Sequence, residues 1–176
     1  MQKLLSLDRV ANILTVVAAV ILIVFLAHRF FSASDSVSDS VSTLPPIGSK
    51  ISFEGFSPGL AKTNVLIAMI KGCRYCEDSM PFYRNLGAKF ATDRTTIYAV
   101  FPPDTKDADS YISSYGLNHV TLLYTRLSSI GVSGTPTVIL TNSSGTVLKV
   151  WEGRLSATQE HELIETLASL NNDGEN

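Results

Sequence analysis

The sequence predicts an α/β fold, in which a mixed central sheet is flanked by helices on both faces and preceded by an N-terminal transmembrane helix. Strand-like apolar runs alternate with helix-like segments through the second two-thirds of the chain, the pattern of layered α/β domains. Two such runs near the C-terminus are separated only by a short turn, so an antiparallel pair is expected within the sheet. An uncharged apolar segment near the N-terminus is typical of a membrane span.

The composition indicates one compact domain with additional segments at its N-terminus. The chain has 176 residues, 45% of them hydrophobic, and a formal net charge of -2. About 130 residues remain after the apolar and Ser-rich N-terminal segments, enough for one hydrophobic core without disulfide staples. The sequence contains no block of Lys and Arg, and we therefore expect no nucleic-acid partner.

The apolar segment covers residues 10–27, contains no charged residue and lies between Arg9 and His28. At about 1.5 Å per residue it is roughly 27 Å long, close to the hydrocarbon thickness of a bilayer. A cleaved signal peptide is the alternative, but the bulky Phe31 spoils the small-residue pattern that a cleavage site requires. We expect residues 1–31 to form an uncleaved signal anchor.

The charges around this segment and the polar stretch after it predict a tethered domain outside the cytoplasm. Lys3 and Arg9 precede the apolar segment and Arg29 follows it, a slight bias toward an N-terminus inside the cell. Residues 32–43 are Ser-rich and acidic, which predicts a flexible linker. The folded domain is therefore expected at residues 44–176, on the periplasmic or extracytoplasmic side of a single-pass membrane protein.

Four apolar runs predict the strands of the sheet. They cover residues 65–70, 95–101, 137–141 and 147–151. The first run is uninterrupted, as expected of a strand buried on both faces. The last two flank Asn142 and Gly145, whose segment is typical of a hairpin turn.

Four segments predict helices, and they begin near Cys73, Asp107, Leu127 and Ser156. In the first, Phe82, Leu86 and Phe90 recur every four residues. The second ends before Gly116, a residue favoured at helix C-termini. The last opens with Ser156 and Gln159 in the spacing of a capping box. Its expected apolar face consists of Leu163, Ile164, Leu167 and Leu170.

The two cysteines of the chain are Cys73 and Cys76, placed between a predicted strand and a predicted helix. This spacing suits thiol–disulfide exchange, in which one thiolate attacks a partner disulfide and the second resolves the mixed disulfide. A structural disulfide is an alternative, although so short a loop stabilises little. Half of a zinc site is another, and it would need further Cys or His ligands near the pair.

Several motifs of residues 44–170 match a known family. Pro81 stands five residues after Cys76, and residues 131–137 read Gly-Val-Ser-Gly-Thr-Pro-Thr. Pro136 and Gly145 are nine positions apart, and Trp151-Glu152-Gly153 follows the last predicted strand. Together with the Cys-x-x-Cys segment, this arrangement resembles the TlpA/ResA-like membrane-anchored thioredoxin-like thiol–disulfide oxidoreductases.

The resemblance implies a thioredoxin-like fold and a role for each site residue. Cys73 would be the exposed nucleophile and Cys76 the buried resolving thiol, with a redox-active Cys73–Cys76 disulfide. Pro136 would be cis, leaving the backbone of Thr135 to pair with a partner segment that also passes Gly72. A helix start lowers a thiol pKa, and the basic side chains of Lys71 and Arg74 would add to that effect. No metal or other cofactor is expected.

The same resemblance implies the partners. We expect protein thiol and disulfide substrates in the envelope and a membrane electron donor or acceptor. Family members are mostly reductases and often serve cytochrome c maturation, so a reductase at the inner or cytoplasmic membrane is implied. Two departures stand out. Gly72 replaces the Trp that the family usually places before the first cysteine. The strand over residues 65–70 lacks the buried carboxylate that many relatives use as a proton acceptor.

Two other functions remain as alternatives. A peroxidase of the peroxiredoxin type would have Thr or Ser three residues before its reactive cysteine, where this chain has Ile70. A Cu(I)-binding or metallochaperone module could use Cys73 and Cys76, joined by His119 or Met80.

Overall fold

The computed structural model describes residues 20, 22 and 44–172, and residues 44–172 lie within one compact unit. Val20 and Leu22 are helical, while the rest of the expected anchor and linker lies outside the described residues. Within the part that is described, no helix is both long and apolar enough to cross a membrane.

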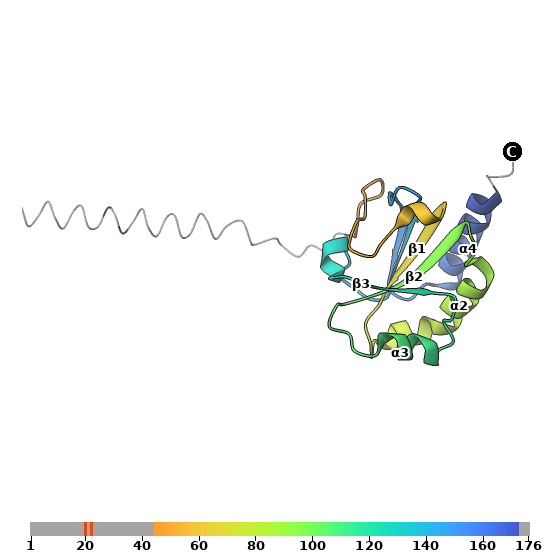
Figure 1. The fold of residues 1–176 in the computed structure, drawn as a ribbon, viewed down its shortest axis with the longest axis horizontal. Coiled ribbons are helices and arrows are strands. Elements are labelled where there is room, and N and C mark those ends of the chain that lie inside the picture. The colour runs from red at the N-terminus through yellow and green to blue at the C-terminus, as the bar shows by residue number, and fades with distance from the viewer. Residues whose placement is uncertain (1–19, 21, 23–43, 173–176) are drawn as a thin grey trace, which may run out of the picture. The chain divides into compact units, whose positions relative to one another are not determined.

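A five-stranded mixed sheet forms the centre of the folded unit, with the strand order β3-β2-β1-β4-β5 (Figure 1). The strands are β1 (Thr63–Ala68), β2 (Thr95–Phe101), β3 (Thr121–Tyr124), β4 (Thr137–Asn142) and β5 (Val147–Glu152). β2 runs parallel to β1 and β3, whereas β4 is antiparallel to β1 and β5. The predicted mixed sheet and its C-terminal hairpin are confirmed, and β3 is an edge strand to which the sequence pattern assigned no range.

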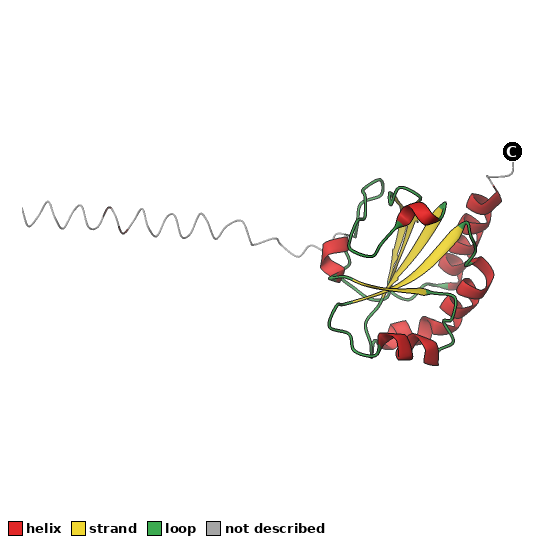
Figure 2. Cartoon of the chain, viewed as in Figure 1, coloured by secondary structure: helices red, strands yellow, loops and turns green. Residues whose placement is uncertain are grey.

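Within residues 44–172, three α-helices and two short 3₁₀ helices flank the sheet (Figure 2). They are η2 (Pro58–Leu60), α2 (Arg74–Phe90), α3 (Ala108–Ser114), η3 (Leu127–Ile130) and α4 (Ala157–Asn172). The predicted capping box at the start of α4 is present: Ser156 N–H donates to Gln159 Oε1 at 2.9 Å, and Gln159 N–H donates to Ser156 Oγ at 3.3 Å.

The alternation of side chains along β1 divides the interior into two hydrophobic clusters. Val65 and Ile67 point into one cluster, and Leu66 and Ala68 into the other, all of them buried. β1 is thus buried on both faces, as its uninterrupted apolar run predicted. It begins two residues earlier than expected, at Thr63.

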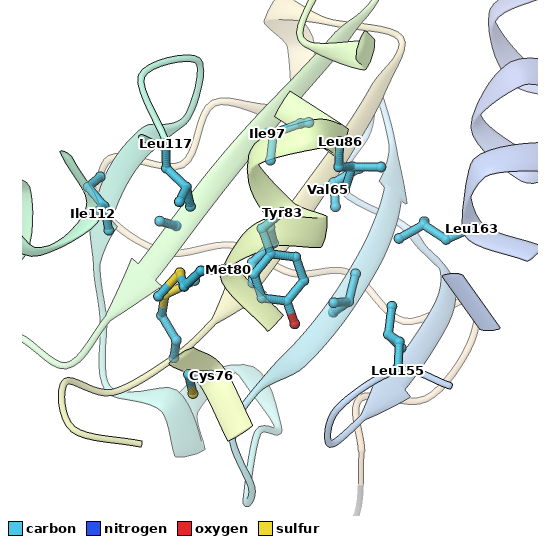
Figure 3. Packing of buried hydrophobic residues seen from close by; sticks show 14 of the residues in the cluster. Val65, Cys76, Met80, Tyr83, Leu86, Ile97, Ile112, Leu117, Leu155 and Leu163 are labelled. Carbon is cyan, nitrogen blue, oxygen red and sulfur yellow. The ribbon is translucent and has the colours of Figure 1, made fainter. Parts of the chain in front are cut away.

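Helices flank the sheet as expected, but unevenly, with the α-helices against one face and the 3₁₀ helix η3 against the other. All three α-helices contribute to the first cluster, part of which is shown in Figure 3. The second is covered by the segment around Ile51 and Phe56 and by Ile130 of η3. η3 makes only one turn because Gly131 ends it in the left-handed region, at φ 72°.

The apolar stripe of α2 differs in detail from the predicted one. Leu86 and Phe90 are buried as expected, but Phe82 is only half-buried. Met80 and Tyr83 join the buried face with Cys76, so the second cysteine belongs to the core side of the helix (Figure 3).

Candidate active site

The turn between β1 and α2 places Cys73 at the N-cap of the helix, with φ -80° and ψ 111°. Gly72 precedes it with φ 77°, in the left-handed region that favours glycine. The Sγ of Cys73 accepts a hydrogen bond from the backbone N–H of Cys76 at 3.2 Å. The first thiol therefore faces the unpaired N–H groups of a 17-residue helix.

The environments of the two thiols differ in the direction that exchange chemistry requires. Partial burial raises the pKa of Cys73, but hydrogen bonds from the Cys76 thiol, from Thr135 and from the N–H groups of Cys76 and Tyr75 outweigh it, leaving a lowered pKa. Burial raises the pKa of Cys76 to about 12, and the hydrogen bond to Cys73 adds to the rise. At neutral pH the first thiol is the better source of a thiolate.

The loop before β4 completes the site from a distant part of the sequence. The Thr135–Pro136 peptide bond is cis, as the resemblance implied. The Sγ of Cys73 lies 3.4 Å from the carbonyl oxygen of Thr135, to which it donates, and 3.6 Å from the Thr135 hydroxyl, from which it accepts. Thr137 steadies the loop by donating from Oγ1 to the carbonyl of Gly134 at 2.7 Å.

The end of β5 lies beside the cis-proline loop. The sequence predicted no functional role for a residue at this position. Glu152 pairs with Thr137 in the β4–β5 ladder, and the N–H of Gly153 donates to the carbonyl of Pro136 at 2.7 Å. Ser133 Oγ donates to Glu152 Oε1 at 3.1 Å. The signal in the sequence was the position of Glu152, directly after a predicted strand that pairs with the strand following Pro136.

The exposed surface around Cys73 combines apolar and basic side chains. Ile70 is 40% exposed and Tyr75 61% exposed, both unusually open for large hydrophobic residues. Lys71 and Arg74 are exposed as well. A Cβ placed on Gly72 would meet no atom within 4 Å, so the space beside this residue is open.

The buried side chains of the described domain include no carboxylate that could accept the proton of Cys76. The buried polar side chains of residues 44–172 are Thr63, Asn64, Ser79, Thr95, Thr137 and Thr141. Tyr83 is fully buried on the same face of α2, and its hydroxyl has no hydrogen-bond partner. Burial raises the pKa of Tyr83 well above its usual value, which keeps the phenol protonated at neutral pH and unable to take the proton of Cys76.

The structure keeps His119 away from the cysteine pair. A Cβ on Gly87 would lie 3.6 Å from the Cβ of His119, which places this histidine beside the C-terminal half of α2. Gly87 and Cys76 are about 16 Å apart along the helix. Met80 lies one turn after Cys76, buried in the core. Among the residues that the structure describes, no three His, Cys, Asp or Glu side chains are grouped to hold a metal.

Comparison with known proteins identifies the fold. Neither the family comparison nor the search of curated proteins returns a match. Many solved structures are similar, and three of them are described here. A thiol:disulfide interchange protein of the thioredoxin family from Chlorobium tepidum TLS has a TM-score of 0.55 and 15% identity, with 69% of this chain and 97% of that chain covered.

The second is a thiol-disulfide isomerase from Corynebacterium glutamicum, with a TM-score of 0.54 and 18% identity over 72% of this chain and 96% of that one. The third is a secreted disulfide oxidoreductase from Mycobacterium tuberculosis, homologous to E. coli DsbE. Its TM-score is 0.50 and its identity 22%, covering 62% of this chain and 84% of that one. These likenesses confirm the expected thioredoxin-like fold.

Proposed function

We propose that this chain is a thiol–disulfide oxidoreductase that exchanges disulfides with proteins through Cys73 and Cys76. One observation carries the proposal: a thiol with a lowered pKa at a helix N-terminus faces a cis-proline loop, with a second thiol buried directly behind it. The solved structures named above are thiol–disulfide enzymes on the same fold, which supports the assignment.

The proposed reaction has two steps. The Cys73 thiolate attacks one sulfur of a partner disulfide, the partner's S–S bond breaks, and its second sulfur leaves as a thiolate that takes up a proton. Cys76 then loses its proton and attacks the Sγ of Cys73, forming the Cys73–Cys76 disulfide and releasing the first partner sulfur. Two electrons pass from this protein to the partner, which leaves as a dithiol. Oxidation of a partner follows the same steps in reverse.

The second step requires a proton acceptor for Cys76, whose pKa is about 12 in the free protein. The buried side chains of residues 44–172 include no carboxylate, and in the proposed step the proton passes to the partner's departing thiolate or to water. Formation of the mixed disulfide removes the Cys73 charge, which otherwise raises the pKa of Cys76. We infer that formation of the mixed disulfide itself promotes the resolving step.

Reduction is the proposed direction, with a membrane electron donor restoring the dithiol and with envelope proteins as substrates, cytochrome c maturation being one such pathway. The support is the family resemblance together with the uncharged segment at residues 10–27. The reduction potential tests the direction: a value near that of thioredoxin, about -270 mV, fits a reductase, and one near -120 mV fits an oxidant.

Trapping tests the exchange itself. The Cys76→Ala variant lacks the resolving thiol and should accumulate covalent adducts with envelope proteins, visible on non-reducing gels and lost with reductant. The Cys73→Ala variant is the matched control and should give few adducts, because Cys76 is buried. If both folded variants trap nothing, exchange is the wrong function, and anaerobic Cu(I) titration of the reduced protein becomes the next measurement.

The topology is tested separately. The slight excess of Lys3 and Arg9 over Arg29 supports a single-pass anchor with the domain outside the cytoplasm. An enzyme reporter that is active only after export, fused after Asn176, should be active. An expressed but silent fusion would reverse the assignment.

A further inference from the structure

The carboxylate of Glu152 is held directly against the loop that faces the nucleophile. Ser133 Oγ donates to its Oε1 at 3.1 Å. A Cβ built on Gly134 would lie only 2.6 Å from the same oxygen, closer than real side chains approach. The carboxylate therefore occupies the space beside residue 134 that a side chain would otherwise fill, and the glycine permits this arrangement.

Backbone hydrogen bonding fixes Glu152 relative to the reacting sulfur. Glu152 pairs with Thr137, and the next residue donates its N–H to the carbonyl of Pro136 at 2.7 Å. Gly134, which the carboxylate contacts, is the neighbour of Thr135, and the carbonyl of Thr135 lies 3.4 Å from the Sγ of Cys73. Only Gly134 and Thr135 therefore lie between the Glu152 carboxylate and the Sγ of Cys73 in this series of contacts.

The charge of Glu152 is exposed and uncompensated. The ion pairs of residues 44–172 join Lys149 to Glu162 and Arg154 to Asp78, His161 contacts Glu165, and none of these contacts includes Glu152. The nearby cation of Arg154 is engaged by Asp78 at 3.6 Å, on the α2 side. An exposed negative charge therefore lies beside the cis-proline loop.

We propose that Glu152 is a specificity-determining residue that favours partner segments with Lys or Arg close to the reacting cysteine, on the side that passes over the cis-proline loop. The inference rests on the proposed function and adds a substrate preference to it. Lys71 and Arg74 flank Cys73 in sequence and carry the opposite charge. A basic partner residue is repelled on their side and attracted on the side of Glu152, so the preference depends on position as well as charge.

The effect should have the size of an exposed ion pair, about 2- to 5-fold in rate for each charge, and it should weaken with salt. Suitable probes are short peptides whose single cysteine forms a disulfide with 5-thio-2-nitrobenzoate. Cys73 attacks the peptide sulfur and releases the coloured thiolate, so absorbance follows the first exchange step. Each peptide carries Lys, Gln or Glu either two positions before or two positions after the cysteine, giving a set of six.

The reduced full chain is compared as wild type, Glu152→Gln, Glu152→Lys and Glu54→Gln. Glu54 is an exposed carboxylate whose neighbour Gly55 lies beside Leu123 of β3, at the opposite edge of the sheet from β5. At one of the two peptide positions, wild type and Glu54→Gln should react fastest with the Lys peptide and slowest with the Glu peptide. Glu152→Gln should lose this order, and Glu152→Lys should reverse it, a result that a purely structural role would not produce.

An order of rates that is unchanged in both Glu152 variants, or lost equally in Glu54→Gln, would overturn the inference while leaving the exchange reaction intact. A different result bears on the proposed function: if wild type releases no more coloured thiolate than Cys73→Ala with any peptide, the exchange reaction itself is wrong.

Discussion

The Sγ of Cys73 lies 3.4 Å from the carbonyl oxygen of Thr135, although the two residues are 62 positions apart in the chain. The Thr135 hydroxyl also donates to the same sulfur at 3.6 Å. The loop that would receive a partner's backbone is therefore also a hydrogen-bond donor to the attacking thiolate.

Alkylation with iodoacetamide should distinguish the two thiols. Because the pKa of Cys73 is lowered and that of Cys76 is raised to about 12, Cys73 should react first, with a midpoint below about 8.5. Mass spectrometry of the modified peptides, followed against pH, provides the measurement. Earlier modification of Cys76 would reject the assigned roles.

The stability of the reduced protein should fall at alkaline pH. The pKa of Cys76 is higher in the folded state than in the unfolded state, so the unfolded chain loses this proton first as the pH rises. The contribution of Cys76 is complete below about pH 8.5 and is lost above it, by up to about 1.4 kcal/mol per pH unit. Urea unfolding between pH 8 and 10 measures the slope, which should be shallower in Cys76→Ala. Equal slopes would show that Cys76 ionises freely in the folded state.

Removing the hydroxyl of Tyr83 should not destabilise the protein. This hydroxyl is buried without a partner, so Tyr83→Phe should leave the free energy of unfolding unchanged or raise it by about 1 kcal/mol. Tyr83→Ala is the control and should cost about 3–5 kcal/mol through the cavity it creates. A loss above about 1 kcal/mol in Tyr83→Phe would indicate that the hydroxyl makes a hydrogen bond, to the Ser79 side chain or to a buried water.

Substituting Gly72 should lower the free energy of unfolding, and the cause should be its backbone conformation rather than a steric clash of the new side chain. Its φ of 77° disfavours other residues, while a Cβ would meet no atom within 4 Å. Gly72→Ala should therefore lower the free energy of unfolding by about 1–2 kcal/mol. Gly59 also has open space around it and has no positive φ, so Gly59→Ala is the matched control and should not reproduce the loss. Equal losses in both variants would point to a cause other than the left-handed conformation.

The capping box of α4 should contribute measurably to stability. Ser156→Ala removes the hydrogen bond to the N–H of Gln159 and should cost about 1 kcal/mol. Gln159→Ala removes the reciprocal bond to the N–H of Ser156. A double-mutant cycle should show losses smaller than additive, because each side chain helps to hold the other in place. Strict additivity would mean that the two bonds form independently.

Local patterns predicted most of the elements. The range 95–101 coincides with β2, and 127–130 with η3, because β-strand and helix periodicities are expressed over a few residues. The capping box formed by Ser156 and Gln159 could be predicted from the sequence for the same reason. The buried stripe of α2 was harder to predict: Phe82 has the right spacing but is only half-buried, while Tyr83 takes the core position.

The sequence by itself determined the reactive pair, the helix that begins beside it and the strands that carry both, since each depends on neighbours in the chain. Only the tertiary structure placed Thr135 against Cys73, Glu152 against Gly134 and all three α-helices on one face of the sheet. These relationships follow from the order β3-β2-β1-β4-β5, in which strands distant in sequence become neighbours. Hydrophobic burial on both faces of β1 stabilises that order, and no local pattern encodes it.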